Sequence, residues 1–413
     1  MLIEENWQAL HQLAEPAFQE VKTSAYMANA LRDLGYDVIS SLTPAQTGVV
    51  AILDSGLPGP VVGLRTDLDA LSFTENGQQI AVHACGHDGH MSMLLAAAEQ
   101  IKEAGIKKGK VKLVLQPAEE VGLGAKALLE TGLLDDINYL FGIHLMPHNL
   151  LKSGQVAAKV NWMACTLMTV EFEGQTAHGS MPHLGINALD AGCALVNAVN
   201  ALHLNPLEGW SVKATRFNTG NGSINAICDY AEISFDLRTT LNASMEKLTA
   251  KFINVVKATA LAYNTDYKIT EVGDCPGTES APEILAIIEK AIVKEMGPQG
   301  LVPEVTTTVG EDFNFYRKLR PDMQTGFLGL GCDLKPCLHD RNMTFDLEQL
   351  PHGAHVLNHI ALDILNESHI PAHLKWAGIF YLCNFKNYLP SFATILSIAS
   401  IVFSFEPKAV RRK

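Results

Sequence analysis

Short apolar runs that alternate with helical patterns are the feature that most restricts the fold of this chain. The runs are bounded by turn residues and span Val49–Leu53, Val61–Leu64, Val111–Leu115, Tyr139–Ile143 and Gly326–Leu330. The helical patterns cover Glu4–Leu34, with Gly35 as a stop, Met91–Ala104 and Ala125–Leu129. Because the runs are apolar throughout, they are typical of strands in a sheet that is covered on both faces. The pattern predicts an α/β fold.

Acidic and imidazole side chains follow several of these strands. Asp67 follows the second run, Glu119 and Glu120 follow the third, His144 follows the fourth, and His339 comes after the last. In open α/β sheets, ligands bind at the edge where the strands have their carboxyl ends. We therefore expect segments that are far apart in the sequence to form one polar site.

The middle of the chain has a different pattern. Leu167–Glu173 and Ala231–Arg238 alternate between apolar and polar residues, and each precedes a helical pattern, Ile186–Leu202 and Met245–Ala262. This indicates a β-α-β-β-α-β unit with one solvated sheet face, inserted into the first domain. The predicted catalytic domain has two parts, 1–158 and 273–366. Between them, 159–272 form an inserted α+β (ferredoxin-like) lid or dimerisation domain, and 367–413 form a tail.

The segment His83–His90, with the sequence HACGHDGH, is the densest group of metal-binding residue types. Cys85 and His87 are two positions apart, so in an extended backbone both side chains would point to one side. A thiolate and an imidazole, joined by carboxylates from other strand ends, suit a transition metal. The alternative is a helix start that happens to be rich in histidine, with His90 as a structural residue on its first turn.

The acids that follow the strands suit different roles. The side chains of adjacent residues diverge, so Glu120 can bind a metal while Glu119 acts as a base, although adjacent acids are more often a solvated turn. Asp67 is a short acid suited to bridging or orienting. Without a metal, His144 would be a core histidine and His339 a loop histidine.

Charge and cysteine usage exclude several classes of protein. The formal net charge is −13, which disfavours nucleic acid as a partner. The eight cysteines are scattered without a Cys-x-x-Cys pair, and the N-terminal sequence has no basic region followed by an apolar run. These features predict a cytoplasmic protein without a disulfide framework.

The tail contains an uncharged segment of uncertain role, Tyr388–Phe405. A helix of that length would extend about 27 Å, slightly less than the hydrocarbon core of a bilayer. Pro390 and several serines weigh against a membrane span. The preferred interpretation is a segment that packs on the enzyme or on another subunit, and membrane contact is the alternative.

Five motifs occur in a recognisable order: RTDLDAL at 65–71, HACGHDGH at 83–90, QPAEE at 116–120, GIH at 142–144 and LH at 338–339. Together they resemble the amidohydrolase branch of the aminoacylase/carboxypeptidase G metallopeptidase family, which includes hippurate and auxin-conjugate hydrolases. The resemblance extends from about residue 8 to residue 366.

This resemblance implies a site with two divalent metal ions and Glu119 as general base. The implied metal ligands are Cys85, His87, Glu120, His144 and His339. The donor set leaves the metal open among Mn, Zn, Ni and Co. The resemblance also implies a homodimer formed through the inserted domain, with His178 reaching the partner's active site. Asn225 and Arg238 resemble substrate-binding positions, and the segment GEDF at 310–313, which contains Glu311, resembles a loop near the site without an assigned role.

The predicted function is metal-dependent hydrolysis of the amide bond in N-acyl amino acids or similar small conjugates. Glu119 and Asp67 are the predicted catalytic residues, together with His178 from the partner subunit. One rival is a thiol hydrolase with Cys85 as nucleophile and His87 as base. Another is a metal-binding scaffold without catalytic activity.

Overall fold

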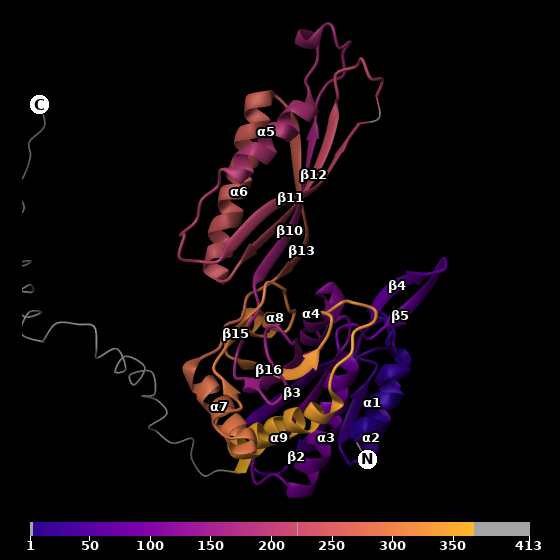
Figure 1. Ribbon diagram of the computed structural model, residues 1–413, viewed down its shortest axis with the longest axis vertical. Coiled ribbons are helices and arrows are strands. Elements are labelled where there is room, and N and C mark those ends of the chain that lie inside the picture. Colours follow the sequence, from indigo (N-terminus) through magenta and orange to yellow (C-terminus); the bar gives the residue numbers. More distant parts are fainter. Residues whose placement is uncertain (1–2, 221, 367–413) are drawn as a thin grey trace, which may run out of the picture. The chain divides into compact units, whose positions relative to one another are not determined.

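A computed structural model describes residues 3–220 and 222–366, and the tail with Tyr388–Phe405 lies outside the described residues. The larger sheet has eight strands in the order β1-β2-β6-β3-β7-β16-β8-β14 (Figure 1). The strands are β1 Asp37–Ser40, β2 Val49–Asp54, β3 Val61–Asp67, β6 Lys110–Gln116, β7 Tyr139–Pro147, β8 Val156–Ala157, β14 Leu301–Val302 and β16 Gln324–Leu334. Strands β6, β3, β7 and β16 are parallel neighbours, so their carboxyl ends meet at one edge.

Helices cover both faces of this sheet. On β2, Val49 and Ala51 belong to one buried cluster and Val50 to another, because successive side chains point to opposite faces. Residues from α1, α2, α3, α7 and α9 pack in the first cluster, and residues from α4 and α8 pack in the second. The helices are α1 Ile3–His11, α2 Val21–Asp33, α3 His87–Ala104, α4 Gly124–Leu129, α7 Pro282–Met296, α8 Asn314–Leu319 and α9 Leu350–Asn366. The predicted α/β class is therefore confirmed.

The N-terminal pattern forms two helices rather than the single one predicted. The chain leaves the helical path after His11 and re-enters it at Val21, with Pro16 between. A proline disfavours helical backbone at the residue before it, here Glu15. The side chain of Glu15 instead accepts a hydrogen bond from the backbone N–H of Thr23 in α2.

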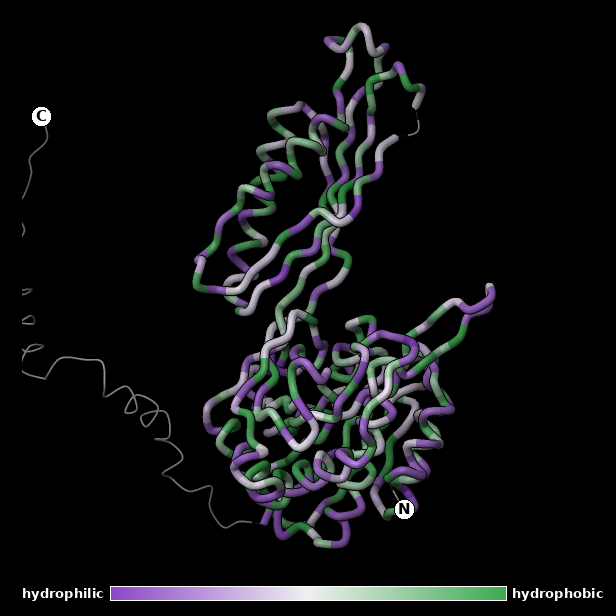
Figure 2. The backbone as a smooth tube through the Cα atoms, viewed as in Figure 1, coloured by the Kyte–Doolittle hydropathy of each residue, from purple (hydrophilic) through white to green (hydrophobic). Residues whose placement is uncertain are grey.

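The inserted segment forms its own antiparallel sheet, in the order β11-β12-β10-β13. Its elements follow the predicted β-α-β-β-α-β sequence: β10 Ala164–Glu173, α5 Ala188–Asn200, β11 Trp210–Thr219, β12 Tyr230–Thr239, α6 Asn242–Tyr263 and β13 Asp266–Cys275. Buried and partly exposed residues alternate along β12, and the long strands of this sheet show mixed hydropathy in Figure 2. The buried side packs against α5 and α6 around residues such as Phe235 and Phe252.

The remaining elements are short. β4 and β5 form a hairpin, and β9 pairs with β15. Their bounds, with those of the 3-10 helices, are β4 Leu71–Glu75, β5 Gln78–Val82, β9 Val160–Asn161, β15 Val305–Thr306, η1 Glu119–Val121, η2 Pro182–Leu184 and η3 Leu347–Gln349. The domain limits given above stay a prediction.

Candidate metal centre

The candidate ligands Cys85 and His87 lie at the turn that leads into α3. Gly86 between them has a φ of 84°, a left-handed conformation that favours glycine, and α3 begins at His87. The extended backbone that was expected between Cys85 and His87 is therefore not present. The turn still brings the Cys85 and His87 side chains together with His144 of β7, with ligand atoms within 4.8 Å of one another.

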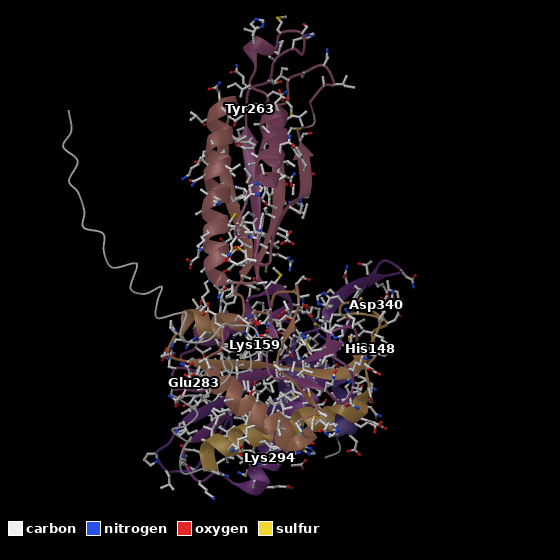
Figure 3. All side chains as sticks on the ribbon, turned by 60° about the vertical axis from the view of Figure 1, so that its left-hand side comes forward. His148, Lys159, Tyr263, Glu283, Lys294 and Asp340 are labelled. Atoms are coloured by element: carbon white, nitrogen blue, oxygen red, sulfur yellow. The ribbon has the colours of Figure 1, made fainter. Side chains whose placement is uncertain are left out.

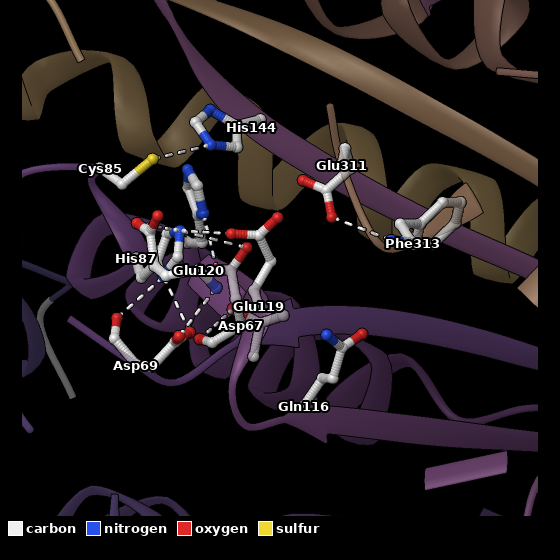
Figure 4. Close-up of polar contacts among 12 residues, drawn as sticks. Asp67, Asp69, Cys85, His87, Gln116, Glu119, Glu120, His144, Glu311 and Phe313 are labelled. Atoms are coloured by element: carbon white, nitrogen blue, oxygen red, sulfur yellow. Dashed lines mark hydrogen bonds and ion pairs between the residues drawn. The ribbon is translucent and has the colours of Figure 1, made fainter. Parts of the chain in front are cut away.

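Hydrogen bonds set which ring nitrogen of each histidine faces the site. Nδ1 of His87 lies 2.8 Å from the carbonyl oxygen of Asp69, and Nδ1 of His144 lies 2.6 Å from that of Leu145. Both rings therefore donate through Nδ1 and turn Nε2 toward the cluster, with Nε2 of His144 at 3.6 Å from Sγ of Cys85 (Figure 4). A backbone carbonyl on the far nitrogen is the usual way of orienting a histidine that binds metal.

Glu119 and Glu120 form the short 3-10 helix η1 after β6. Ala118, just before them, has a φ of 55°, and its N–H donates a 2.8 Å hydrogen bond to the buried carboxylate of Glu20. The N–H of Glu120 donates to Oδ2 of Asp69 at 2.9 Å. Side chains from two other segments therefore hold the backbone that carries the paired acids.

The two acids approach the histidines at different points. Oε1 of Glu120 lies 3.8 Å from Nε2 of His87, and its Oε2 lies 3.4 Å from Nε2 of His339. Oε2 of Glu119 is 4.0 Å from Nε2 of His87. The two glutamates thus face the same cluster from one turn of chain, and Glu120 makes the closer contacts.

His339 comes from the loop after β16. Its φ is 66°, and its N–H donates a 2.7 Å hydrogen bond to the carbonyl oxygen of Ala84. This bond ties the loop to the turn that carries Cys85. As a result, Cys85, Glu120 and His339 form a second group of ligand atoms within 4.8 Å of one another.

Asp67 is fully buried at the end of β3. Oδ1 lies 2.8 Å from Nδ1 of His90, and Oδ2 accepts a 2.8 Å hydrogen bond from Arg65. Nε2 of His90 accepts the backbone N–H of Leu145. Asp67 thus connects the β3 strand end to the first turn of α3, and its Oδ2 stands 3.7 Å from Nε2 of His87.

A buried network centred on Arg65 supports the site, and the residue patterns gave it no role. Its guanidinium donates to Gln116, Asp67, Glu311 and Asp312 at 2.8 to 3.1 Å. Gln116 also donates to Asp312, at 2.7 Å. In the sequence, only the segment 310–313 pointed to this network. Its two adjacent acids, Glu311 and Asp312, need a positively charged partner when they are buried.

Crowded carboxylates determine the electrostatics of the site. Burial, with Glu311 and Glu120 nearby, raises the pKa of Glu119 well above its usual value. Burial likewise raises the pKa of Glu120 and that of Glu311 to about 7. Burial and the two η1 glutamates raise the pKa of the Cys85 thiol well above its usual value. Additional positive charge is therefore favourable at this position.

A cavity of about 370 Å³ opens beside the cluster. Arg238 of β12 lines it, although its guanidinium is held by Asp236 and donates to the carbonyl oxygen of Thr308 at 2.5 Å. His178 and Asn225 are exposed and do not line this cavity. Within the described chain, the structure therefore brings Arg238 to the site but not these two residues.

The residues present fit a pair of divalent cations. Nε2 of His87 and Oε1 of Glu120 are buried without a hydrogen-bond partner, at the point where the candidate ligands converge. The Cys85–His87–His144 group and the Cys85–Glu120–His339 group share the sulfur of Cys85. Sulfur, imidazole and carboxylate ligands together suit borderline transition metals such as zinc.

The chain also matches a known protein family. The model of peptidase family M20/M25/M40 matches residues 63–363, a stretch that contains every candidate ligand. The chain belongs to this family. The M20 assignment confirms the relationship indicated by the five motifs.

Curated relatives from plants and bacteria match most of the chain. An IAA-amino acid hydrolase ILR1-like 5 of Arabidopsis thaliana is 30% identical, over 87% of this chain and 86% of its own length. The N-acetyl-L-cysteine deacetylase of Bacillus subtilis is 29% identical, over 87% of both chains. The hippurate hydrolase of Campylobacter jejuni is 28% identical, over 86% of this chain and 94% of its own.

Solved structures share the M20 fold. A putative aminohydrolase from methicillin-resistant Staphylococcus aureus has a TM-score of 0.79 at 28% identity, covering 88% of this chain and 96% of its own. The YXEP protein of Bacillus subtilis, described as a dinuclear metal-binding peptidase of the M20 family, has a TM-score of 0.73 at 23% identity, covering 88% and 97%. Both cover the catalytic sheet and the inserted sheet. Among residues 3–220 and 222–366, no helix is long and apolar enough to cross a membrane.

Proposed function

We propose that this chain is a metal-dependent amidohydrolase that cleaves the amide bond of N-acyl amino acids or similar small conjugates. The observation that carries the proposal is the pair of ligand groups that share Cys85, with Glu119 beside them. Relatives named for the hydrolysis of hippurate and of auxin conjugates, and for deacetylation of N-acetyl-L-cysteine, support the substrate class.

The cations would be held by five side chains: Cys85, His87, Glu120, His144 and His339. When bound, two divalent cations lower the pKa of a water molecule toward about 7 and polarise the substrate carbonyl. Manganese, zinc, nickel and cobalt all suit these donors.

Glu119 would act as the general base. Its carboxylate accepts a proton from the attacking water and later returns it to the nitrogen of the departing amine. Asp67 would orient the site, because its Oδ1 holds His90 and its Oδ2, which accepts from Arg65, also lies 3.7 Å from Nε2 of His87.

Arg238 and Asn225 would bind the substrate. An arginine can hold a free carboxylate through two parallel hydrogen bonds, which would select N-acyl amino acids. In the described chain Asp236 occupies the Arg238 guanidinium, so a substrate carboxylate would compete with it. His178, reaching the site from the partner subunit of a homodimer, would stabilise the developing oxyanion. We place the enzyme in the cytoplasm, in keeping with the free cysteines of the described chain.

Two neighbouring substitutions test the roles of the acids. Glu119→Gln should retain its metal and lose activity on N-acetyl and N-benzoyl amino acids by about 100-fold or more. Glu120→Gln should lose bound metal as well as activity. Glu348→Gln, at an exposed position, is the control. Near-normal turnover by Glu119→Gln would refute its assignment as base.

Chelation separates this proposal from a thiol hydrolase. Cys85 and His144 are close enough to form a thiol–imidazole pair, but the raised pKa of Cys85 opposes a reactive thiolate. Exhaustive removal of divalent cations should abolish activity, and adding them back should restore it. Activity that survives chelation would favour the thiol mechanism, and no turnover on a broad panel of amides would favour a scaffold.

A further inference from the structure

A second group of metal-binding residue types lies on the helices α7 and α9, away from the strand ends. We call it the α7/α9 histidine cluster; it consists of Glu295, His352, His355 and His359. Glu295 lies in the last turn of α7, and the histidines occupy the first turns of α9. The two helices pack against each other (Figure 1). Spacings of three and four residues place the three imidazoles along one face of α9.

The three imidazoles converge on one carboxylate. Nδ1 of His352 and Nδ1 of His355 each lie 2.9 Å from Oε1 of Glu295. Nε2 of His359 lies 3.7 Å from the other oxygen, Oε2. Glu295, His352 and His355 thus present ligand atoms within 4.8 Å of one another.

The cluster is accessible and still well anchored. The side chains of His352 and His355 are 39% and 41% exposed, whereas those of His359 and Glu295 are 20% and 15% exposed. An ion and its water molecules can therefore approach from solvent. Gly353, on another side of α9, is buried close to Met93 of the hydrophobic core.

Two lysines near Glu295 pair with a different carboxylate, that of Asp363. Nζ of Lys294 lies 3.3 Å from Asp363, and Nζ of Lys290 lies 3.1 Å from the same carboxylate. Burial acts to raise the pKa of Glu295, but hydrogen bonds from His352 and His355 outweigh it and the pKa is lowered. Burial and Lys294 lower the pKa of His359, which favours its neutral form.

We propose that the α7/α9 histidine cluster binds a divalent transition-metal ion such as Zn²⁺, through the Glu295 carboxylate and the imidazoles of His352, His355 and His359. Three nitrogens and one oxygen form a usual tetrahedral donor set for zinc. At bond lengths of about 2.0–2.1 Å, tetrahedral ligand atoms lie about 3.3 Å apart. The 2.9 Å contacts therefore need to open by only a few tenths of an ångström.

Binding requires a proton rearrangement in two of the rings. His352 and His355 now donate through Nδ1, and each would bind the ion through Nδ1 as the neutral tautomer that carries its proton on Nε2. Both Nε2 atoms can then donate to solvent, because these side chains are substantially exposed. The bound ion would join the end of α7 to the beginning of α9.

Metal stoichiometry tests the proposal on the full chain. Protein stripped with a chelator is dialysed against micromolar Zn²⁺ and its zinc content is measured. With two ions at the strand-end site, wild type should bind three per chain and the double variant His352→Ala/His355→Ala should bind two. The double variant should keep its amidohydrolase activity, because neither residue belongs to the strand-end site.

His148→Ala is the matched control. His148 is also a partly exposed histidine paired with a carboxylate, that of Asp333. Figure 3 labels His148 and Lys294, the neighbour of Glu295, on separate parts of the surface. The control should bind as much zinc as wild type. Equal zinc content in wild type and in the double variant would overturn the proposal.

A second measurement keeps the test decisive if the double variant folds poorly. Zn²⁺ should slow amide hydrogen exchange in the last turn of α7 and the first turns of α9 in wild type, and not in Glu295→Gln. Unchanged exchange in both proteins would also overturn the proposal. If the strand-end site bound no zinc, wild type and the double variant would both bind two ions fewer. The difference of one ion between them would remain.

Discussion

Nε2 of His339 lies 3.4 Å from Oε2 of Glu120, although the two residues come from loops that follow different strands. The backbone N–H of His339 also bonds to Ala84, next to Cys85. The loop after β16 therefore closes the second ligand group, and without His339 only Cys85 and Glu120 would remain in it.

Substitution of His339 should remove one cation and leave the other. We expect His339→Ala to bind about one metal ion per strand-end site instead of two, and to lose about 100-fold or more in kcat/KM. Elemental analysis with kinetics on an N-acyl amino acid measures both effects. His203→Ala, an exposed histidine on the inserted domain, is the control. Full occupancy in His339→Ala would remove this residue from the ligand set.

The exposure of His178 leads to a test of dimerisation. If His178 acts in the partner's site, His178→Ala and Glu119→Gln are each inactive alone, but a mixed dimer has one site with both residues intact. Random exchange of subunits would give about a quarter of the sites in that form. Mixing the two variants should therefore recover about a quarter of wild-type activity. No recovery, with subunit exchange verified by a tag, would show that His178 does not act across the dimer.

The gathering of polar side chains at the strand ends could be predicted from the sequence, because parallel strands bring their carboxyl ends to one edge. Asp67, Glu119 and His144 needed only that rule and the apolar runs before them. The path of the chain at Cys85 could not be predicted in the same way, because it depends on the left-handed conformation of Gly86, which the spacing of Cys85 and His87 does not reveal. The Arg65 network depends on Glu311 and Asp312, which no local pattern connects with β3.

The sequence does not predict the α7/α9 histidine cluster, for a related reason. The spacing of His352, His355 and His359 alone indicates a helix face, and such a face is usually solvated. The partner Glu295 lies on another helix, so only the packing of α7 against α9 reveals the convergence.

The buried carboxyl of Glu20 should make stability depend on pH. Burial, with a contribution from Asp69, raises its pKa from 4.5 to about 7. Because the unfolded chain ionises at the lower value, the folded state loses stability as pH rises from 4.5 through 7, by about 3 kcal/mol. Glu20→Gln keeps the acceptor for the Ala118 N–H and has no charge. Its stability relative to wild type, measured by urea unfolding, should therefore increase across this pH window.

Glu20→Ala provides the contrast. It leaves the Ala118 N–H without its acceptor, so we expect it to be less stable than Glu20→Gln by about 1–3 kcal/mol at every pH. It should also lower activity, since Ala118 precedes the two η1 glutamates. A pH-independent difference between wild type and Glu20→Gln would show that Glu20 does not titrate as described.

Arg65→Lys should reveal how far the site depends on its supporting network. The side chains of Arg65 and Asp67 are almost completely buried, and the guanidinium serves acceptors on several segments. A lysine ammonium cannot reproduce that planar set of donors, so buried carboxylates would lose partners. We expect destabilisation of about 3–5 kcal/mol in urea unfolding, together with weaker metal binding because Asp67 would shift. Arg216→Lys, at an exposed pair with Glu232, should cost less than about 1 kcal/mol. If the two substitutions had equal effects, the Arg65 network would not be what holds Asp67 in place.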